Sequence, residues 1–111
     1  MPRDTVEYVL VLTTLPLNLD ASALARTLVE ERLVACVNVL PPMQSTYRWK
    51  EEVEQESERQ VIMKTTRERI SALQTRLGEL HPYDVPEFIV VPILQGSEAY
   101  LSWIAESTGP G

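Results

Sequence analysis

Two segments of the chain are apolar at four consecutive positions, Val9-Leu10-Val11-Leu12 and Phe88-Ile89-Val90-Val91. A strand with one solvated face alternates apolar and polar side chains, so these runs predict core strands whose two faces both need cover. We expect these strands to extend over residues 6–13 and 88–93. A chain of 111 residues forms one ordinary domain and has few residues left to cover a second sheet face.

Three other segments have the spacing of apolar residues that is typical of helices. Asp20 stands in the N-cap position of the first helix, and the pair His81-Pro82 ends the second. We expect the helices over about residues 20–32, 67–80 and 98–106.

The middle of the chain predicts a long β-hairpin. A strand over residues 34–40 is expected to be interrupted by Pro41-Pro42, since proline cannot donate a hydrogen bond to a neighbouring strand. The chain then alternates apolar and charged residues from residue 45, and a return strand is expected over 57–66. Five glutamates are expected at a solvated hairpin tip: Glu51, Glu52, Glu54, Glu56 and Glu58. A hard divalent cation bound by their carboxylates is the alternative.

The resulting order, βαββαβ followed by a helix, indicates an α+β ferredoxin-like sandwich with a long β-hairpin arm and a C-terminal helix. We interpret residues 1–111 as a single domain with an ordered core from about 5 to 107 and a frayed end at 108–111. Both helices of the βαββαβ unit lie on one face of such a sheet. We therefore expect another copy of the chain to cover the other face.

Charge and composition exclude several classes of partner. The net charge is −6 at pH 7, which argues against binding to nucleic acid or to a membrane surface. No apolar run approaches the ~20 residues that span a bilayer. A strand-like pattern follows the N-terminus directly, so we expect no secretory signal and a cytoplasmic location. The chain also lacks the P-loop, dinucleotide, G-x-S-x-G and H-E-x-x-H motifs, and we expect a protein that is not an enzyme.

The chain has one histidine and one cysteine. His81 could bind copper or zinc, but a side chain that caps the end of a helix is the favoured interpretation. Cys36 lies inside a predicted strand, and we expect a buried, unreactive thiol.

Tyr47 and Trp49 lie on one face of the predicted arm. They could anchor an oligomer or line a cleft for a small molecule. Lys64 and Glu58 could form an ion pair or line the same cleft.

Five ordered motifs together resemble the CutA divalent-cation-tolerance family. They are Ala35-Cys36-Val37-Asn38, Tyr47-Arg48-Trp49, Lys64-Thr65, His81-Pro82-Tyr83-x-x-Pro86-Glu87 and Tyr100-Leu101-x-Trp103-Ile104. The resemblance extends from about Val6 to Ser107 and implies a homotrimer in which the hairpins extend the sheets of neighbouring subunits. It also implies a link to divalent metals, notably copper, and a likeness to PII-like signalling trimers that bind small ligands between subunits.

The resemblance assigns His81 as a candidate metal ligand. Together with the residues singled out above, the candidates for a ligand cleft or an interface are Tyr47, Trp49, Glu58, Lys64, Tyr83, Glu87 and Trp103.

The sequence departs from the family pattern at three positions. Glu51 stands where a glycine is usual, which puts the tight backbone expected there in question. Thr13 and Leu80 replace a cysteine and a histidine that are proposed copper ligands in some members. We therefore expect copper, or another divalent cation, to bind only weakly.

Overall fold

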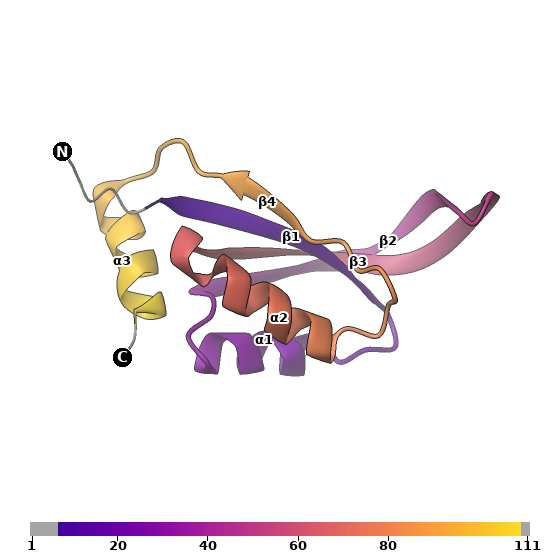
Figure 1. Ribbon diagram of the computed structural model, residues 1–111, viewed down its shortest axis with the longest axis horizontal. Coiled ribbons are helices and arrows are strands. Elements are labelled where there is room, and N and C mark those ends of the chain that lie inside the picture. Colours follow the sequence, from indigo (N-terminus) through magenta and orange to yellow (C-terminus); the bar gives the residue numbers. More distant parts are fainter. Residues whose placement is uncertain (1–6, 110–111) are drawn as a thin grey trace.

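The computed structural model describes residues 7–109, and these residues form the predicted ferredoxin-like α+β fold (Figure 1). A four-stranded antiparallel sheet has the strand order β2-β3-β1-β4. Its strands are β1 (Tyr8–Pro16), β2 (Cys36–Trp49), β3 (Glu52–Thr66) and β4 (Ile89–Pro92). The predicted start of the first strand at Val6 lies outside the described residues.

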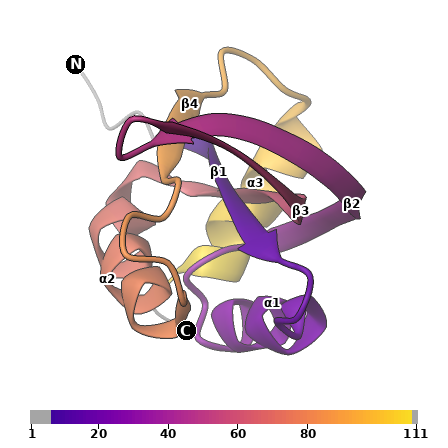
Figure 2. The same ribbon diagram turned by 90° about the vertical axis from the view of Figure 1, so that its right-hand side faces the viewer.

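Three α-helices accompany the sheet: α1 (Ala21–Glu30), α2 (Ile70–Leu80) and α3 (Glu98–Thr108). A 3₁₀ turn, η1 (Arg67–Arg69), precedes α2. Asp20 is the N-cap of α1, as predicted, and its side chain accepts a hydrogen bond from the backbone N–H of Ala23. Both α1 and α2 lie beneath one face of the sheet, and α3 lies at the end away from the arm (Figures 1 and 2).

The core lies between the sheet and the helices α1 and α2. β1 and β3 contribute alternate residues to it, because successive side chains of a strand point to opposite faces. The fully buried members include Val11, Leu28, Val61, Met63, Leu73 and Leu77. Each fully buried leucine of this set contributes about 1.5–3 kcal/mol relative to an exposed one.

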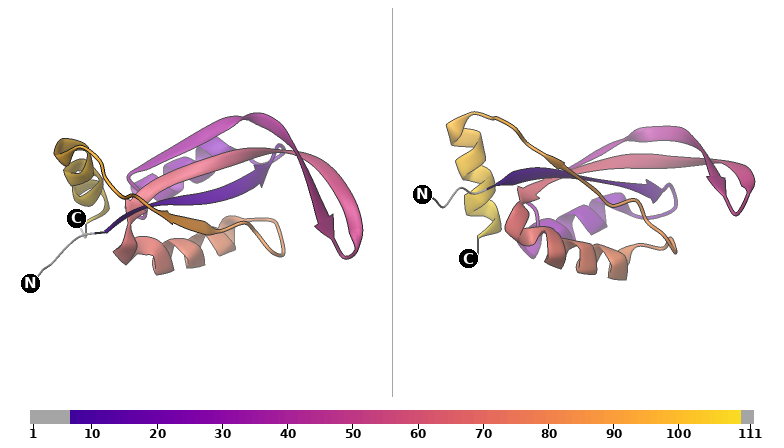
Figure 3. Two further views of the ribbon diagram at one scale, coloured as in Figure 1. Left: turned by 90° about the horizontal axis from the view of Figure 1, so that it is seen from above. Right: turned by 45° about the horizontal axis from the view of Figure 1, so that its top comes forward.

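No helix of the described residues lies over the opposite face of the sheet. Residues that pair directly across the strands share a face, which places Leu10 with Lys64, Cys36 and Val91, and Leu12 with Ile62 and Ile89. We call this surface the open face: Leu10, Leu12, Cys36, Asn38, Ile62, Lys64, Ile89 and Val91. Seen from above, in the left view of Figure 3, no helix lies in front of the strands.

The open face corrects three predictions of burial. β1 is not buried on both faces, since Leu10 and Leu12 are half-buried. β4 is not a core strand, and all four of its residues are exposed. Cys36 is half-buried and not in the core. The physical reason is the same in all three cases. The helices α1 and α2 of a single chain cover only one face of the sheet.

β2 and β3 extend beyond the rest of the sheet as a two-stranded arm, which makes the molecule 50 Å long (Figure 1). The prediction that Pro41-Pro42 interrupts the strand is wrong. β2 continues through both prolines, with a shift in register between Val39 and Pro42. An edge strand tolerates prolines at such a bulge because one of its sides has no strand to pair with.

The arm ends in a two-residue turn, Lys50-Glu51, between the paired residues Trp49 and Glu52. Both turn residues have positive φ, 50° and 68°, as in a type I′ hairpin. The prediction of five glutamates at the tip is therefore wrong for most of them. The return strand begins at Glu52, and Glu58 is buried near the base of the arm.

The end of α3 is held in place, which corrects the prediction of fraying from residue 108. Arg32 donates to the carbonyl oxygens of Gly109 and Glu106 at 2.7 Å each, and Arg69 donates to that of Thr108 at 2.7 Å. Thr108 is also buried. Residues 110 and 111 lie outside the described residues. The single domain over 1–111, with its ordered core from residue 5, stays a prediction.

Candidate functional site

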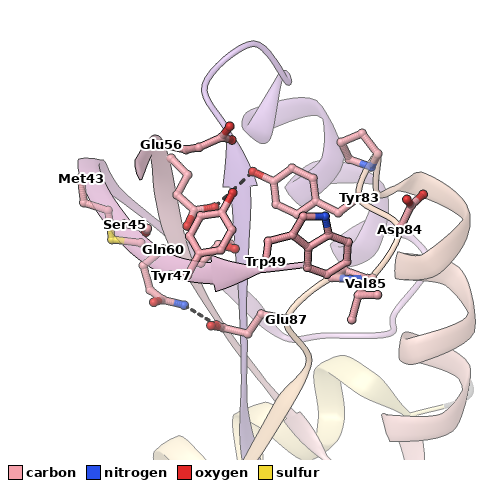
Figure 4. Close-up of a pocket in the computed structure, with 14 residues that line it drawn as sticks. Met43, Ser45, Tyr47, Trp49, Glu56, Gln60, Tyr83, Asp84, Val85 and Glu87 are labelled. Atoms are coloured by element: carbon pink, nitrogen blue, oxygen red, sulfur yellow. Dashed lines mark hydrogen bonds between the residues drawn. The ribbon is translucent and has the colours of Figure 1, made fainter. Parts of the chain in front are cut away.

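A cavity of about 680 Å³ lies between the arm and the loop that joins α2 to β4 (Figure 4). We call it the arm pocket. β2 and β3 form one wall, and the loop over residues 82–87 forms the other. The lining residues are Thr14, Met43, Ser45, Tyr47, Trp49, Glu56, Glu58, Gln60, Pro82, Tyr83, Asp84, Val85, Pro86 and Glu87.

The arm wall follows from strand alternation. Met43, Ser45, Tyr47 and Trp49 are alternate residues of β2, so their side chains share one face. Their cross-strand partners on β3 are glutamates, with Met43 opposite Glu58 and Ser45 opposite Glu56. The wall therefore combines large aromatic rings with carboxylates.

Glu58 is the most deeply placed of these carboxylates, with 8% of the residue exposed. Its Oε1 accepts a hydrogen bond of 3.1 Å from the hydroxyl of Tyr83 on the opposite wall. None of the ion pairs within residues 7–109 involves Glu58. A glutamate this deeply buried is normally paired with a cation, so the carboxylate leaves negative charge uncompensated in the pocket.

Two tyrosines of the pocket have raised pKa values. Burial and the neighbouring carboxylate of Glu58 raise the pKa of Tyr83 to about 12. Partial burial, followed by the charges of Glu56, Glu54 and Glu58, raises the pKa of Tyr47. Both hydroxyls stay neutral and can donate hydrogen bonds at neutral pH.

A second carboxylate, that of Glu87, is held at the other side of the pocket. Gln60 Nε2 donates to Glu87 Oε2 and to the backbone carbonyl of Thr13, at 2.8 Å each. In Figure 4 the Gln60–Glu87 bond lies below the rings of Tyr47 and Trp49, and Glu56 lies above them. Carboxylates and aromatic rings thus line the same cavity.

His81 lies behind the loop wall and is buried. Its Nε2 is 2.7 Å from the carbonyl oxygen of Thr14, so Nε2 carries the proton. Its Nδ1 accepts from the backbone N–H of Tyr83 at 3.2 Å, and the two rings lie 4.7 Å apart. The side chain therefore connects the end of α2 to β1 and orients Tyr83, and does not cap its own helix as the favoured interpretation expected.

The pocket brings together five of the residues expected in a cleft: Tyr47, Trp49, Glu58, Tyr83 and Glu87. The other two, Lys64 and Trp103, lie elsewhere. Lys64 Nζ is 3.3 Å from the hydroxyl of Tyr100, whose ring packs against Trp103 at 5.3 Å. Lys64 and Glu58 therefore form no ion pair.

Comparison with known proteins agrees with this fold. The family model described as CutA1 divalent ion tolerance protein matches residues 9–107. The chain belongs to the CutA1 family.

Similar proteins occur in bacteria and in plants. The divalent-cation tolerance protein CutA of Thermus thermophilus is 46% identical over 99 residues, which cover 89% of this chain and 96% of the relative. The chloroplastic protein CutA of Arabidopsis thaliana is 39% identical, over 94% of this chain and 57% of the relative. The crystal structure of CutA1 from Oryza sativa superposes with a TM-score of 0.90 at 36% identity, over 96% of this chain and 98% of the other.

Thr13 and Leu80 are the two positions where the sequence predicts that copper ligands are missing. Thr13 is fully buried, and Leu80 is half-buried against the core. Within residues 7–109, no three His, Cys, Asp or Glu side chains form a group that could hold a metal ion. No helix of that range is long and apolar enough to cross a membrane.

Sequence reasoning missed several lining residues of the pocket. The charge pattern predicts Glu56 at the arm tip, and it does not single out Gln60, Asp84 or Thr14. Strand alternation could have found Glu56 and Gln60, because they lie two residues either side of Glu58 on one face of β3.

Proposed function

We propose that this protein is a homotrimer without enzymatic activity that contributes to divalent-cation tolerance by binding a cation, or a small ligand, in the arm pocket. The observation that carries the proposal is the buried Glu58 carboxylate, which faces a cavity and has no cationic partner within the described residues. A bound cation would compensate this charge. The proposal places the protein in the cytoplasm.

The open face supports self-association. Its apolar side chains continue to β4, an edge strand with exposed residues on both faces. Beyond β4, Leu94 is 98% exposed. An apolar surface and an open strand edge of this kind are suited to contact with a second copy of the chain. The family resemblance implies three copies, with the arms extending neighbouring sheets.

Copper is expected to bind weakly in this proposal. The pocket offers carboxylate oxygens, which suit hard cations, and copper prefers nitrogen and sulfur ligands. His81 could serve as a ligand only after its Nδ1 releases the backbone N–H of Tyr83. We expect a dissociation constant in the micromolar range or above.

Calorimetric titration with Cu²⁺ tests the metal part of the proposal. Wild type, Glu58→Gln and His81→Ala are compared, and sedimentation equilibrium of each checks for about three chain masses. We expect saturable, weak binding that Glu58→Gln reduces. Nanomolar affinity for Cu²⁺ would contradict the proposal. Cu²⁺ binding that neither substitution changes, or a stable monomer, would also contradict it.

A second function is a PII-like signalling or scaffold trimer whose link to metals is indirect. It is favoured by the engaged ring nitrogens of His81 and by the lack of a three-ligand group within residues 7–109. A trimer that binds a small organic molecule in the arm pocket, and no divalent cation there, would support this second function.

A further inference from the structure

The walls of the arm pocket contain two kinds of group with different preferences. Carboxylates attract any cation and repel anions. Aromatic rings favour cations that are weakly hydrated, because a ring face cannot replace the water around a small divalent ion. The combination therefore selects for an organic cation.

The aromatic contribution comes from both sides of the cavity. Tyr47 and Trp49 stand on the arm, and Tyr83 stands on the loop wall (Figure 4). An ammonium group already lies near one of these rings, since Lys50 Nζ is 5.7 Å from the centroid of Trp49. Lys50 belongs to the exposed turn at the tip and does not line the pocket.

The carboxylates retain capacity for a ligand. Oε1 of Glu58 accepts from the Tyr83 hydroxyl, and Oε2 of Glu87 accepts from Gln60, so each carboxylate has one neutral donor. A carboxylate can accept several hydrogen bonds, and those from an ionised donor are the stronger ones. Neither residue forms an ion pair within residues 7–109.

We propose that the arm pocket binds a small organic ammonium ion, with its N–H groups directed to the carboxylates and its carbon chain against the aromatic rings. This inference rests on the proposed function, since it names the ligand class of the same pocket. A cavity of about 680 Å³ accepts a chain of several methylene groups together with its charged ends.

Putrescine and butanediol are matched probes, because they share a carbon chain and differ in charge. The chain has two tryptophans, so Trp103→Phe leaves Trp49 as the sole fluorescent tryptophan. We expect putrescine to change its emission saturably at constant ionic strength, and butanediol to have no effect. Equal responses to the two probes, or no saturation at millimolar putrescine, would overturn the inference.

Two variants locate the site by calorimetry. Trp49→Leu removes a pocket ring, and Trp103→Leu is its matched control, because the two tryptophans are 40% and 42% exposed. We expect Trp49→Leu and Glu58→Gln each to weaken putrescine binding about tenfold, and Trp103→Leu to leave it unchanged. If all three variants bound putrescine with similar affinity, the assignment of the site to the arm pocket would be wrong.

Circular dichroism and sedimentation of each variant confirm that fold and assembly are intact. The Cu²⁺ titration separates this inference from the proposed function. If Cu²⁺ binding depends on Glu58 and putrescine does not bind, the inference is overturned and the proposed function is not. Failure of both titrations overturns the two together.

Discussion

At the scale of single residues, the hydroxyl of Thr13 is an unsatisfied group in the core. It is fully buried, and its Oγ1 has no hydrogen-bond partner among residues 7–109. Burial of an unpaired hydroxyl destabilises a protein by about 1–3 kcal/mol. We therefore expect Thr13→Val to stabilise the fold by about 1 kcal/mol, measured by denaturant unfolding at the same protein concentration.

Thr65 on the neighbouring strand β3 is the matched control. It is also fully buried, but its Oγ1 donates to the carbonyl oxygen of Leu33 at 2.8 Å. Thr65→Val leaves that acceptor without its donor, so it should destabilise the fold by about 1 kcal/mol or more. Effects of the same sign for the two substitutions would contradict the assignment.

The raised pKa of Tyr83 gives a spectroscopic signature of the pocket. Its folded value of about 12 exceeds the ordinary 10.0, so the neutral phenol is favoured in the folded state. This contribution to stability is present below pH 10 and is lost as the pH rises from 10 to 12. In an ultraviolet titration of phenolate, we expect Tyr83→Phe to remove a late-ionising component.

Glu58→Gln should move that component towards lower pH, because the carboxylate charge and its hydrogen bond both raise the pKa of Tyr83. A titration unaffected by Glu58→Gln would mean that the hydrogen bond is absent in solution.

At the scale of elements, the arm tip adopts a turn that its sequence does not favour. Type I′ turns prefer Asn-Gly, and this tip has Lys50-Glu51 with φ of 50° and 68°. Positive φ costs a residue with a side chain about 1–2 kcal/mol. We expect Glu51→Gly to stabilise the protein by about 1 kcal/mol in thermal or denaturant unfolding.

Glu51→Ala separates the backbone effect from the charge effect. It removes the carboxylate and retains Cβ, so it should stabilise the protein much less than Glu51→Gly does. If alanine stabilised as much as glycine, repulsion from neighbouring glutamates and not backbone strain would be the cause.

Elements with strong periodicity could be predicted from the sequence, and elements that depend on their neighbours could not. The helices α1 and α2 and the order of strands follow from apolar spacing. The continuity of β2 through Pro41-Pro42 depends on its edge position, which no local pattern reveals. The exposure of β4 likewise depends on what lies beyond it.

The candidate site could be predicted in part for a related reason. Tyr47, Trp49 and Glu58 share one face of the hairpin, and residues 83 and 87 follow in one loop. The predicted ion pair of Lys64 with Glu58 is wrong, because Lys64 lies six positions further along β3. Distances along an extended strand grow by about 3.3 Å per residue, which takes Lys64 out of the pocket.

At the scale of the whole molecule, Cys36 reports on assembly. It is half-buried on the open face, beside Lys64 in the register of β2 and β3. If copies of the chain cover that face, the thiol should react slowly with a thiol reagent in the native oligomer and rapidly after unfolding. Rapid labelling of a native oligomer would place the interface elsewhere on the molecule.

The strand order also has a consequence for synthesis on the ribosome. β1 is central in the sheet and is made first, but its neighbours β3 and β4 end at residues 66 and 92. The nascent chain therefore holds the apolar run of β1 without a partner strand until β3 has been made. Folding must await the last third of the chain, and until then β1 is a segment for chaperones to shield.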